Sequence, residues 1–381
     1  MEINNFTHYK FEGWLPNDWE VKDAADVCIK ITDGTHDTPK VVDSGIPFIT
    51  AIHVKKGKID FDNCLYISEE EHEKIYKRCN PSKGDLLVVN IGAGVAEYAF
   101  VETDKEFSLK NVALLKPNSD LLHDKYLCYH HAYKKENIAH RVKSGGAQPF
   151  LSLKELRKLK IVLPPLPEQQ KIAKILSTWD KAISTTECLI ENSTQQKKAL
   201  MQQLLTGKKR LLDDGGKQFE GEWEEVKQGD VAKFFNGRAY KQNEWEEKGT
   251  PVIRLQNLTG RGLNYYYSTL TLPEHQYCNK GDLLYMWSAT FGPAIWQGDK
   301  AIYHYHIWKV ECKAELLHKI YMYYLLDYET QRLMSKTNVM GLMHVTKGTM
   351  ENQLISLPTF REQQKIATVL TNADREIELL E

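Results

Sequence analysis

The sequence has no long apolar segment and no excess of charge of either sign. No hydrophobic run approaches the roughly 20 residues that a membrane-spanning helix needs. The 50 Lys and Arg residues nearly balance the 51 Asp and Glu residues, which excludes a polycation of the histone type. The first ten residues, MEINNFTHYK, lack the pattern of a secretory signal. We therefore expect a cytoplasmic protein whose contacts with nucleic acid, if any, are local patches.

Metal-binding spacings are missing as well. The seven cysteines are scattered singly, without a CxxC pair or a Cys/His cluster, which argues against a structural zinc site. His304 and His306 alternate within one predicted strand, 302–308, and have no third ligand nearby in the sequence. We expect no metal ion on this chain.

Catalytic signatures are also absent. The sequence contains neither the GxxxxGK[ST] loop of ATP-driven enzymes nor the Asn/Asp-Pro-Pro-Tyr motif of amino-methyltransferases. A GxG pair at Gly92 and Gly94 lacks the third glycine of a nucleotide-binding loop and is interpreted as a tight turn. Glu20-x-Lys22 and Glu225-x-Lys227 resemble half of a nuclease site, but each suits the first strand of a domain. These absences predict a non-catalytic chain that binds no cofactor itself.

What the sequence does contain is an internal repeat. The segment EQQKIA occurs at residues 168–173 and again at 362–367. Shorter matches precede it in the same order, namely FEG at 11–13 and 219–221, KGDLL at 83–87 and 280–284, and LLH at 121–123 and 316–318. The period of about 200 residues far exceeds that of solenoid repeats, so it indicates a duplicated domain.

Each copy is predicted to be an α+β domain followed by a long helix. Short β-rich runs such as 86–89 alternate with helical stretches, and prolines followed by Glu and Gln mark helix starts near 167 and 359. The predicted boundaries are domain 1 at 1–166, a spacer helix at 167–207, domain 2 at 208–358 and a shorter helix at 359–381. The duplication predicts a pseudo-twofold arrangement.

The two helices carry an apolar seam with the 4-3 spacing of a coiled coil. Its main members are Ile172, Leu176, Trp179, Ile183, Leu200 and Leu204 in the first helix and Ile366, Leu370 and Ile377 in the second. Two copies related by a twofold axis require antiparallel helices. We therefore expect the short second helix to cover Leu200 and Leu204 and to leave Ile172, Leu176 and Trp179 uncovered. A first helix of about 57 Å would hold the two domains apart.

Candidate nucleic-acid contacts are polar side chains in loops, at strand ends and at a helix end. Phosphate contacts are expected from cations, and base contacts from Arg, Asn and Gln. These candidates are Asn90, Arg141, Lys143, Ser144, Gln148, Lys208, Lys209, Arg254, Gln256 and Asn257.

The whole chain resembles the specificity subunit of type I restriction-modification enzymes. The resemblance lies in LPPLPEQQKIA at 163–173, KKALMQQLLTGK at 197–208, LPNDWEV at 15–21 and ITDGTH at 31–36. It implies a non-catalytic subunit with two target-recognition domains that binds a bipartite DNA target. Thr35, His36, Arg238 and His344 are further candidate DNA contacts.

The resemblance further implies partners. Two methyltransferase subunits would carry S-adenosylmethionine and modify adenine, and restriction subunits would bring ATP- and Mg²⁺-dependent cleavage. Two alternatives stay open from the sequence: a single-chain methyltransferase or nuclease with its own recognition domains, and a coiled-coil scaffold that does not bind DNA.

Overall fold

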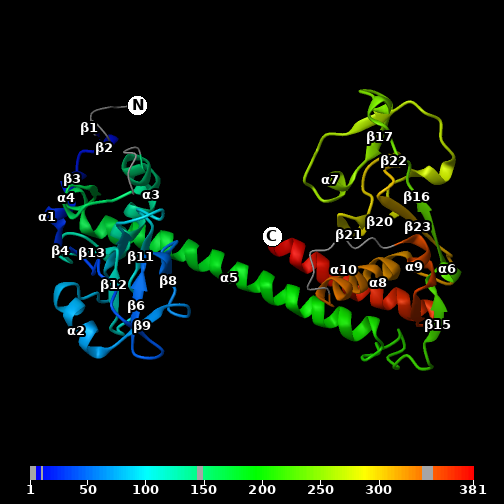
Figure 1. The fold of residues 1–381 in the computed structure, drawn as a ribbon, viewed down its shortest axis with the longest axis horizontal. Coiled ribbons are helices and arrows are strands. Elements are labelled where there is room, and N and C mark those ends of the chain that lie inside the picture. Colours follow the sequence, from blue (N-terminus) through cyan, green and yellow to red (C-terminus); the bar gives the residue numbers. More distant parts are fainter. Residues whose placement is uncertain (1–5, 10–11, 144–148, 337–345) are drawn as a thin grey trace. The chain divides into compact units, whose positions relative to one another are not determined.

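The computed structural model describes residues 6–9, 12–143, 149–336 and 346–381. Contacts within the chain divide it into unit 1, Met1–Ser184, and unit 2, Thr185–Glu381. The division falls inside one helix, α5 (Leu166–Leu205), of 40 residues (Figure 1). The sequence-based domain boundaries were placed at the ends of this helix instead, and they stay predictions.

Unit 1 is built around two four-stranded sheets. The antiparallel sheet has the order β11 (Tyr98–Phe100), β10 (Leu86–Val89), β13 (Val112–Pro117), β4 (Cys28–Asp33). The mixed sheet has the order β12 (Ser108–Lys110), β6 (Ile46–Thr50), β9 (Leu65–Ile67), β5 (Val41–Val42), with β12 parallel to β6. Two-stranded pairs are β14 (Lys160–Leu163) with β3 (Glu20–Asp23), β1 (Phe6–Tyr9) with β2 (Gly13–Pro16), and β7 (Val54–Lys55) with β8 (Lys58–Ile59).

The helices of unit 1 pack around these sheets. They are α1 (Ala24–Val27), α2 (Glu69–Arg78), α3 (Asp124–Lys143), α4 (Leu153–Arg157) and the first part of α5, with a 3-10 turn η2 (Ala51–His53). Strand β10 shows why the core forms between two layers: Leu86 and Val88 enter one buried cluster, while Leu87 and Val89 enter another. Because side chains alternate across a strand, an all-apolar strand is buried on both faces.

Unit 2 repeats the same plan. Its antiparallel sheet has the order β16 (Ala232–Asn236), β23 (Ile307–Cys312), β20 (Leu283–Ser288), β21 (Thr290–Ile295). Its mixed sheet has the order β18 (Tyr266–Ser268), β17 (Thr250–Ile253), β22 (Ala301–Tyr303), β19 (Tyr277–Cys278), with β17 parallel to β22. Strand β15 (Glu224–Lys227) pairs with β24 (Leu354–Leu357). The predicted α+β class and the duplication are confirmed.

The helices of unit 2 also correspond to those of unit 1. They are α6 (Gln228–Val231), α7 (Leu255–Leu258), α8 (Lys319–Lys336), α9 (Lys347–Asn352) and α10 (Phe360–Leu380), with 3-10 turns η3 (Gln242–Glu244) and η4 (Glu274–Gln276). One predicted strand is wrong. The run 302–308 is broken, because β22 ends at Tyr303 and β23 begins at Ile307. His304 and His306 therefore lie in a connection rather than on one strand face.

The repeated EQQ motif fastens each long helix to its own domain. Gln169 accepts the N–H of His123 (2.9 Å) and donates to the carbonyls of Leu121 (3.0 Å) and Pro164 (2.8 Å). Its counterpart Gln363 makes the same three bonds, with His318 (2.8 Å), Leu316 (3.0 Å) and Pro358 (3.0 Å). Both glutamines are buried. We call each set of three bonds the glutamine clasp.

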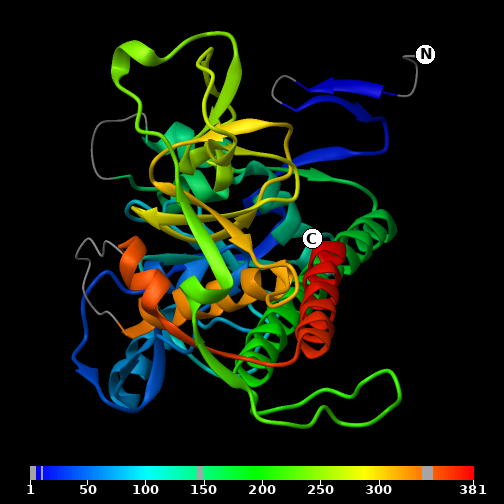
Figure 2. The same cartoon turned by 90° about the vertical axis from the view of Figure 1, so that its right-hand side faces the viewer.

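Helix α10 packs antiparallel on the last part of α5 within unit 2 (Figures 1 and 2). Lys197 pairs with Asp374, whereas Arg210, just beyond α5, pairs with Glu362 at the start of α10. Residue numbers therefore rise along one helix as they fall along the other, as the sequence predicted. Leu204, Ile366 and Leu370 are fully buried and share one core. Leu200 packs on the same core, and Ile377 is half-buried.

The first part of α5 in unit 1 presents an apolar face to solvent. Leu176, Trp179 and Ile183 are 39%, 66% and 55% exposed, as predicted for the first two. The prediction for Ile172 is wrong, because this side chain packs against the core of unit 1. At Ile172, about one turn after Gln169, helix α5 still packs on unit 1. Within unit 1, the apolar seam becomes exposed from Leu176 onward.

Candidate DNA interface

In both units a glycine lets a loop pass close to the ends of the two parallel strands. A Cβ on Gly34 would lie 2.0 Å from the carbonyl oxygen of Leu109, and one on Gly237 would lie 2.3 Å from those of Tyr303 and His304. No side chain fits at such distances. The two glycines therefore bring the following residue, Thr35 or Arg238, against the end of β12 or β22.

The backbone bonds at this point are the same in the two units. Thr35 bridges Lys110 in unit 1, and Arg238 bridges His304 in unit 2, both in parallel register. Because β12 and β22 are each parallel to a neighbour, the carboxyl ends of the two strands meet at one edge of the sheet. We call this place the strand-end edge of each unit. Edges of this kind commonly carry binding residues.

At the strand-end edge of unit 1, the side chains form a polar network around a buried carboxylate. Asp33 is 3% exposed and contacts His36 Nε2 at 3.1 Å through Oδ2, while its other oxygen pairs with Arg78. Lys110 donates to the hydroxyl of Thr38. Thr35 and His36, both predicted as DNA contacts, therefore lie together here.

A matched turn holds the residue at the end of each central strand, namely Thr50, the last residue of β6, and Arg254, the first residue after β17. The Thr50 N–H donates to Nδ1 of His53 (3.0 Å), and the Arg254 N–H donates to Oδ1 of Asn257 (2.9 Å). Burial lowers the pKa of His53, in keeping with this nitrogen acting as an acceptor. Asn257 also donates to two loop carbonyls, so its amide holds the loop together. Gln256, another predicted contact, is half-buried in the same turn.

Unit 2 places aromatic rings where unit 1 has a polar network. We define the aromatic platform as Tyr240, Trp245 and Tyr266. Trp245 stacks on Tyr240 with centroids 4.9 Å apart and contacts Tyr266 at 4.6 Å. The Arg254 guanidinium lies 5.3 Å from the ring of Tyr266 and 5.8 Å from that of Trp245, and Arg238 lies 4.4 Å from the ring of Tyr240. Cations at such distances are attracted to ring faces.

Charge is distributed unevenly over this cluster. Arg238 is paired with Glu244, so its charge is compensated. Burial, followed by the nearby His306 and Arg254, lowers the pKa of His304 to about 4, so this imidazole is neutral at pH 7. The structure thus brings Arg238 and Arg254, predicted separately from the sequence, to one place beside a neutral histidine.

The structure buries Asn90, one of the predicted DNA contacts. It follows strand β10, as predicted, but it is 0% exposed and therefore does not reach a DNA surface. Its amide nitrogen and oxygen are buried without a hydrogen-bond partner among the described residues. Its neighbours Gly92 and Val95 form the tight turn expected from the GxG pair, since the Val95 N–H donates to the Gly92 carbonyl (3.0 Å).

The remaining cationic candidates lie on other elements of the fold. Lys208 and Lys209 are exposed just after α5, whereas Arg210 is tied to Glu362. Arg141 and Lys143 occupy the last turn of α3 and are exposed. Ser144, Gln148 and His344 lie outside the described residues.

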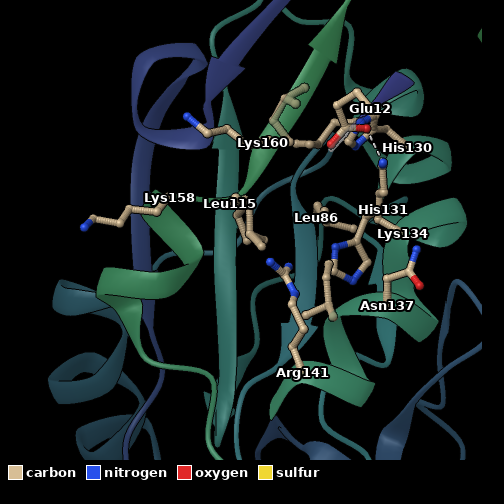
Figure 3. A pocket seen from close by; sticks show the side chains of 14 residues that line it. Glu12, Leu86, Leu115, His130, His131, Lys134, Asn137, Arg141, Lys158 and Lys160 are labelled. Atoms are coloured by element: carbon tan, nitrogen blue, oxygen red, sulfur yellow. Dashed lines mark hydrogen bonds and ion pairs between the residues drawn. The ribbon is translucent and has the colours of Figure 1, made fainter. Parts of the chain in front are cut away.

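Arg141 also lines a small pocket of about 110 Å³ in unit 1. Figure 3 shows its guanidinium beside Leu115 and His131. Lys134 lies farther along α3, next to Glu12 from the turn before β2. Lys134 and Glu12 form an ion pair. Burial lowers the pKa of His130 and His131 to about 4, so both are neutral near pH 7.

Sequence reasoning missed the aromatic platform. The signal was present, because Tyr265-Tyr266-Tyr267 and Trp245 lie on either side of Arg254 in the sequence. Ring–ring contacts between residues about 20 positions apart cannot be inferred from spacing alone. In the part of the chain that the structure describes, no group of three or more His, Cys, Asp and Glu is arranged to hold a metal ion. Over the same residues, no helix is long and apolar enough to cross a membrane.

Known proteins with similar sequences and folds give this geometry a family context. The family model for the type I restriction modification DNA specificity domain matches residues 16–193 and 220–381. The type I restriction enzyme MjaVIII specificity subunit of Methanocaldococcus jannaschii is 26% identical, covering 96% of this chain and 88% of its own. The EcoBI specificity subunit of Escherichia coli is 26% identical over 48% of this chain and 38% of its own.

A solved structure shares the fold. The S subunit of a type I restriction-modification system from M. genitalium is 15% identical, with a TM-score of 0.59 over 96% of this chain and 92% of its own. Since the family model matches most of the sequence, once in each repeat, the chain belongs to the type I restriction-modification DNA specificity family.

Proposed function

We propose that each unit reads one half of a bipartite DNA target at its strand-end edge. The observation that carries this proposal is a shared scaffold with different side chains at matched positions. Thr35 and Arg238 follow the close-packed glycines and bridge Lys110, the last residue of β12, and His304, the first residue after β22. Side chains that differ in charge and hydrogen bonding on one backbone are what two different half-sites require.

As the specificity subunit, the chain itself is non-catalytic. It directs adenine methylation by methyltransferase subunits and restriction by further subunits that join the complex. We propose that two methyltransferase subunits bind, one for each domain-plus-helix repeat, because the repeat supplies two equivalent sets of surfaces. S-adenosylmethionine, ATP and Mg²⁺ would then be bound by the partners, in the cytoplasm.

A domain exchange tests the division of the target. Residues 208–358 are replaced by the second recognition domain of another specificity subunit, and methylated adenines are mapped in the DNA of cells that also express the methyltransferase. One half of the methylated motif should change, and the other should stay the same. A change in both halves, or in neither, would contradict the proposal.

Two measurements test the subunit roles. The purified chain, incubated with labelled S-adenosylmethionine and DNA, should transfer no methyl group until methyltransferase is added. Light scattering of the reconstituted complex should give the mass of one specificity chain with two methyltransferases. Methyl transfer that copurifies with this chain alone would support a single-chain enzyme instead.

A further inference from the structure

We propose that Arg254 reads a guanine in the half-site recognised by unit 2. The inference rests on the proposed function and assigns one base to one side chain. Arg254 is the first residue after β17, at the strand-end edge where β17 and the parallel β22 finish. Its counterpart in unit 1 is Thr50, the last residue of β6, which has no charge.

The position of Arg254 is fixed from two directions. Its backbone N–H is bonded to the side chain of Asn257 (2.9 Å), which in turn holds the loop through the carbonyls of Gly262 and Asn264 (3.1 Å each). Its guanidinium rests against two rings of the aromatic platform, at 5.3 and 5.8 Å. A side chain that is ordered before binding loses less conformational entropy when it meets a base.

The guanidinium N–H groups of Arg254 make no ion pair with an acidic side chain among the described residues. Arg238 pairs with Glu244, and Arg210 pairs with Glu362. No carboxylate in the described part of the chain pairs with Arg254. Its neighbour His304 is uncharged at neutral pH. The positive charge of Arg254 is therefore not compensated by a carboxylate of the described residues, and the side chain lies half-buried beside the aromatic platform.

Guanine fits this arrangement better than a phosphate does. An arginine fork donates two parallel hydrogen bonds to O6 and N7 of guanine in the major groove, which no other base offers as a pair of acceptors. A phosphate contact needs only a flexible positive charge. The guanidinium lies over two rings, those of Trp245 and Tyr266. These contacts restrict its motion, which recognition of a base edge requires and charge neutralisation does not.

The test compares Arg254→Gln, Arg254→Lys and Arg261→Gln in the complex with the methyltransferase. Arg261 is an exposed cation seven residues along the chain and serves as the matched control for loss of charge. Methylated motifs are mapped in genomic DNA. Methylation rates are then measured on duplexes that carry each of the four base pairs at every position of the motif.

Both Arg254 variants should relax one G·C position in one half of the motif. Discrimination at that position should fall by about ten- to one-hundred-fold, while all other positions keep theirs. The lysine variant should behave like the glutamine variant, because lysine keeps the charge but not the fork. Arg261→Gln should leave the motif unchanged.

Several results would overturn the assignment: an unchanged motif in Arg254→Gln, full rescue by Arg254→Lys, relaxation in both halves, or a motif without a G·C pair in the half read by unit 2. The domain exchange identifies that half independently. If the exchange alters one half and Arg254→Gln alters nothing, only this inference fails. If the exchange leaves both halves unchanged, the proposed function fails.

Discussion

The two strand-end edges use one backbone for two kinds of chemistry. In unit 1 a buried carboxylate, Asp33, organises His36 and Arg78 through polar contacts. In unit 2 the rings of the aromatic platform lie beside the half-buried cation of Arg254. The glycine, the bridge and the turn are the same in both. The scaffold and the recognition surface are therefore separable properties of this fold.

The largest effect on stability is expected from substitutions that disrupt the scaffold shared by the two units. Gly34→Ala and Gly237→Ala each place a Cβ within 2.3 Å or less of a carbonyl oxygen, so the loop must move. Each should destabilise its own unit by about 2–4 kcal/mol. Urea denaturation checks this, with Gly94→Ala and Gly348→Ala as controls, since a Cβ at those sites meets nothing closer than 3.9 Å. Equal stability of Gly34→Ala and Gly94→Ala would refute the close approach.

The second test removes the glutamine clasp from one unit at a time. Gln169→Leu and Gln363→Leu each remove the hydrogen-bond partner of one backbone N–H and two carbonyls, of which the proline carbonyl is in a buried bond. The cost should be about 2–3 kcal/mol in either unit. The exposed neighbours Gln170 and Gln364, changed to Ala, should have little effect. Thermal unfolding of the four variants gives the comparison, and unequal losses for the two clasps would show that the units depend on them differently.

The third test uses acid to separate the units. Helix α3 carries His130 and His131 at the positions where α8 carries Leu325 and Leu326. The alignment of the two helices follows from the tyrosine that precedes each pair. The folded-state pKa of His131 is about 4, below the ordinary 6.5 of an unfolded chain. The unfolded state therefore binds more protons, and unit 1 loses stability as the pH falls from about 6.5 to 4.

The loss should reach about 2–3 kcal/mol for the fully buried His131. Hydrogen–deuterium exchange at pH 7 and pH 4.5 should show unit 1 opening first. His131→Leu should reduce that pH dependence, whereas unit 2, with its half-buried His304, should respond less. Earlier opening of unit 2 would contradict the comparison.

The smallest effect concerns contacts that serve both half-sites. Lys208 and Lys209 are exposed and lie outside both strand-end edges. If they contact phosphates, changing both to Gln should weaken binding to all sequences alike. The slope of log K against log salt should become shallower by about two. Fluorescence anisotropy on cognate and unrelated duplexes measures both quantities, and a loss confined to the cognate duplex would exclude a phosphate role.

The sequence predicts the architecture well, because the architecture is written in repeated local patterns. The EQQKIA repeat, the proline-marked helix starts and the apolar seam led to the duplication, to α5 and to the antiparallel contact of α10. The failures have physical causes. Ile172 was assigned to the seam by its spacing, although the clasp holds the start of the helix against unit 1.

The candidate interface was predicted only in part. Asn90 follows a strand, but whether a strand end is covered depends on loops that pairwise spacing does not describe. Arg254 and Arg238 were named, yet the platform beside Arg254 combines two segments, the β16–β17 connection with Tyr240 and Trp245 and strand β18 with Tyr266. Which side chains share a surface is a property of the tertiary fold, whereas which segments form strands is largely local.

The glutamine clasp has a consequence for how new specificities can arise. Its members are identical in the two repeats: LLH before the helix, a proline at its entry and EQQ in its first turn. A recognition domain acquired from a related gene would therefore meet a familiar connection at the helix, provided that it brings the same few residues. Evolution can exchange whole recognition domains between such chains without redesigning the joint, and a change of DNA target need not pass through an unstable intermediate.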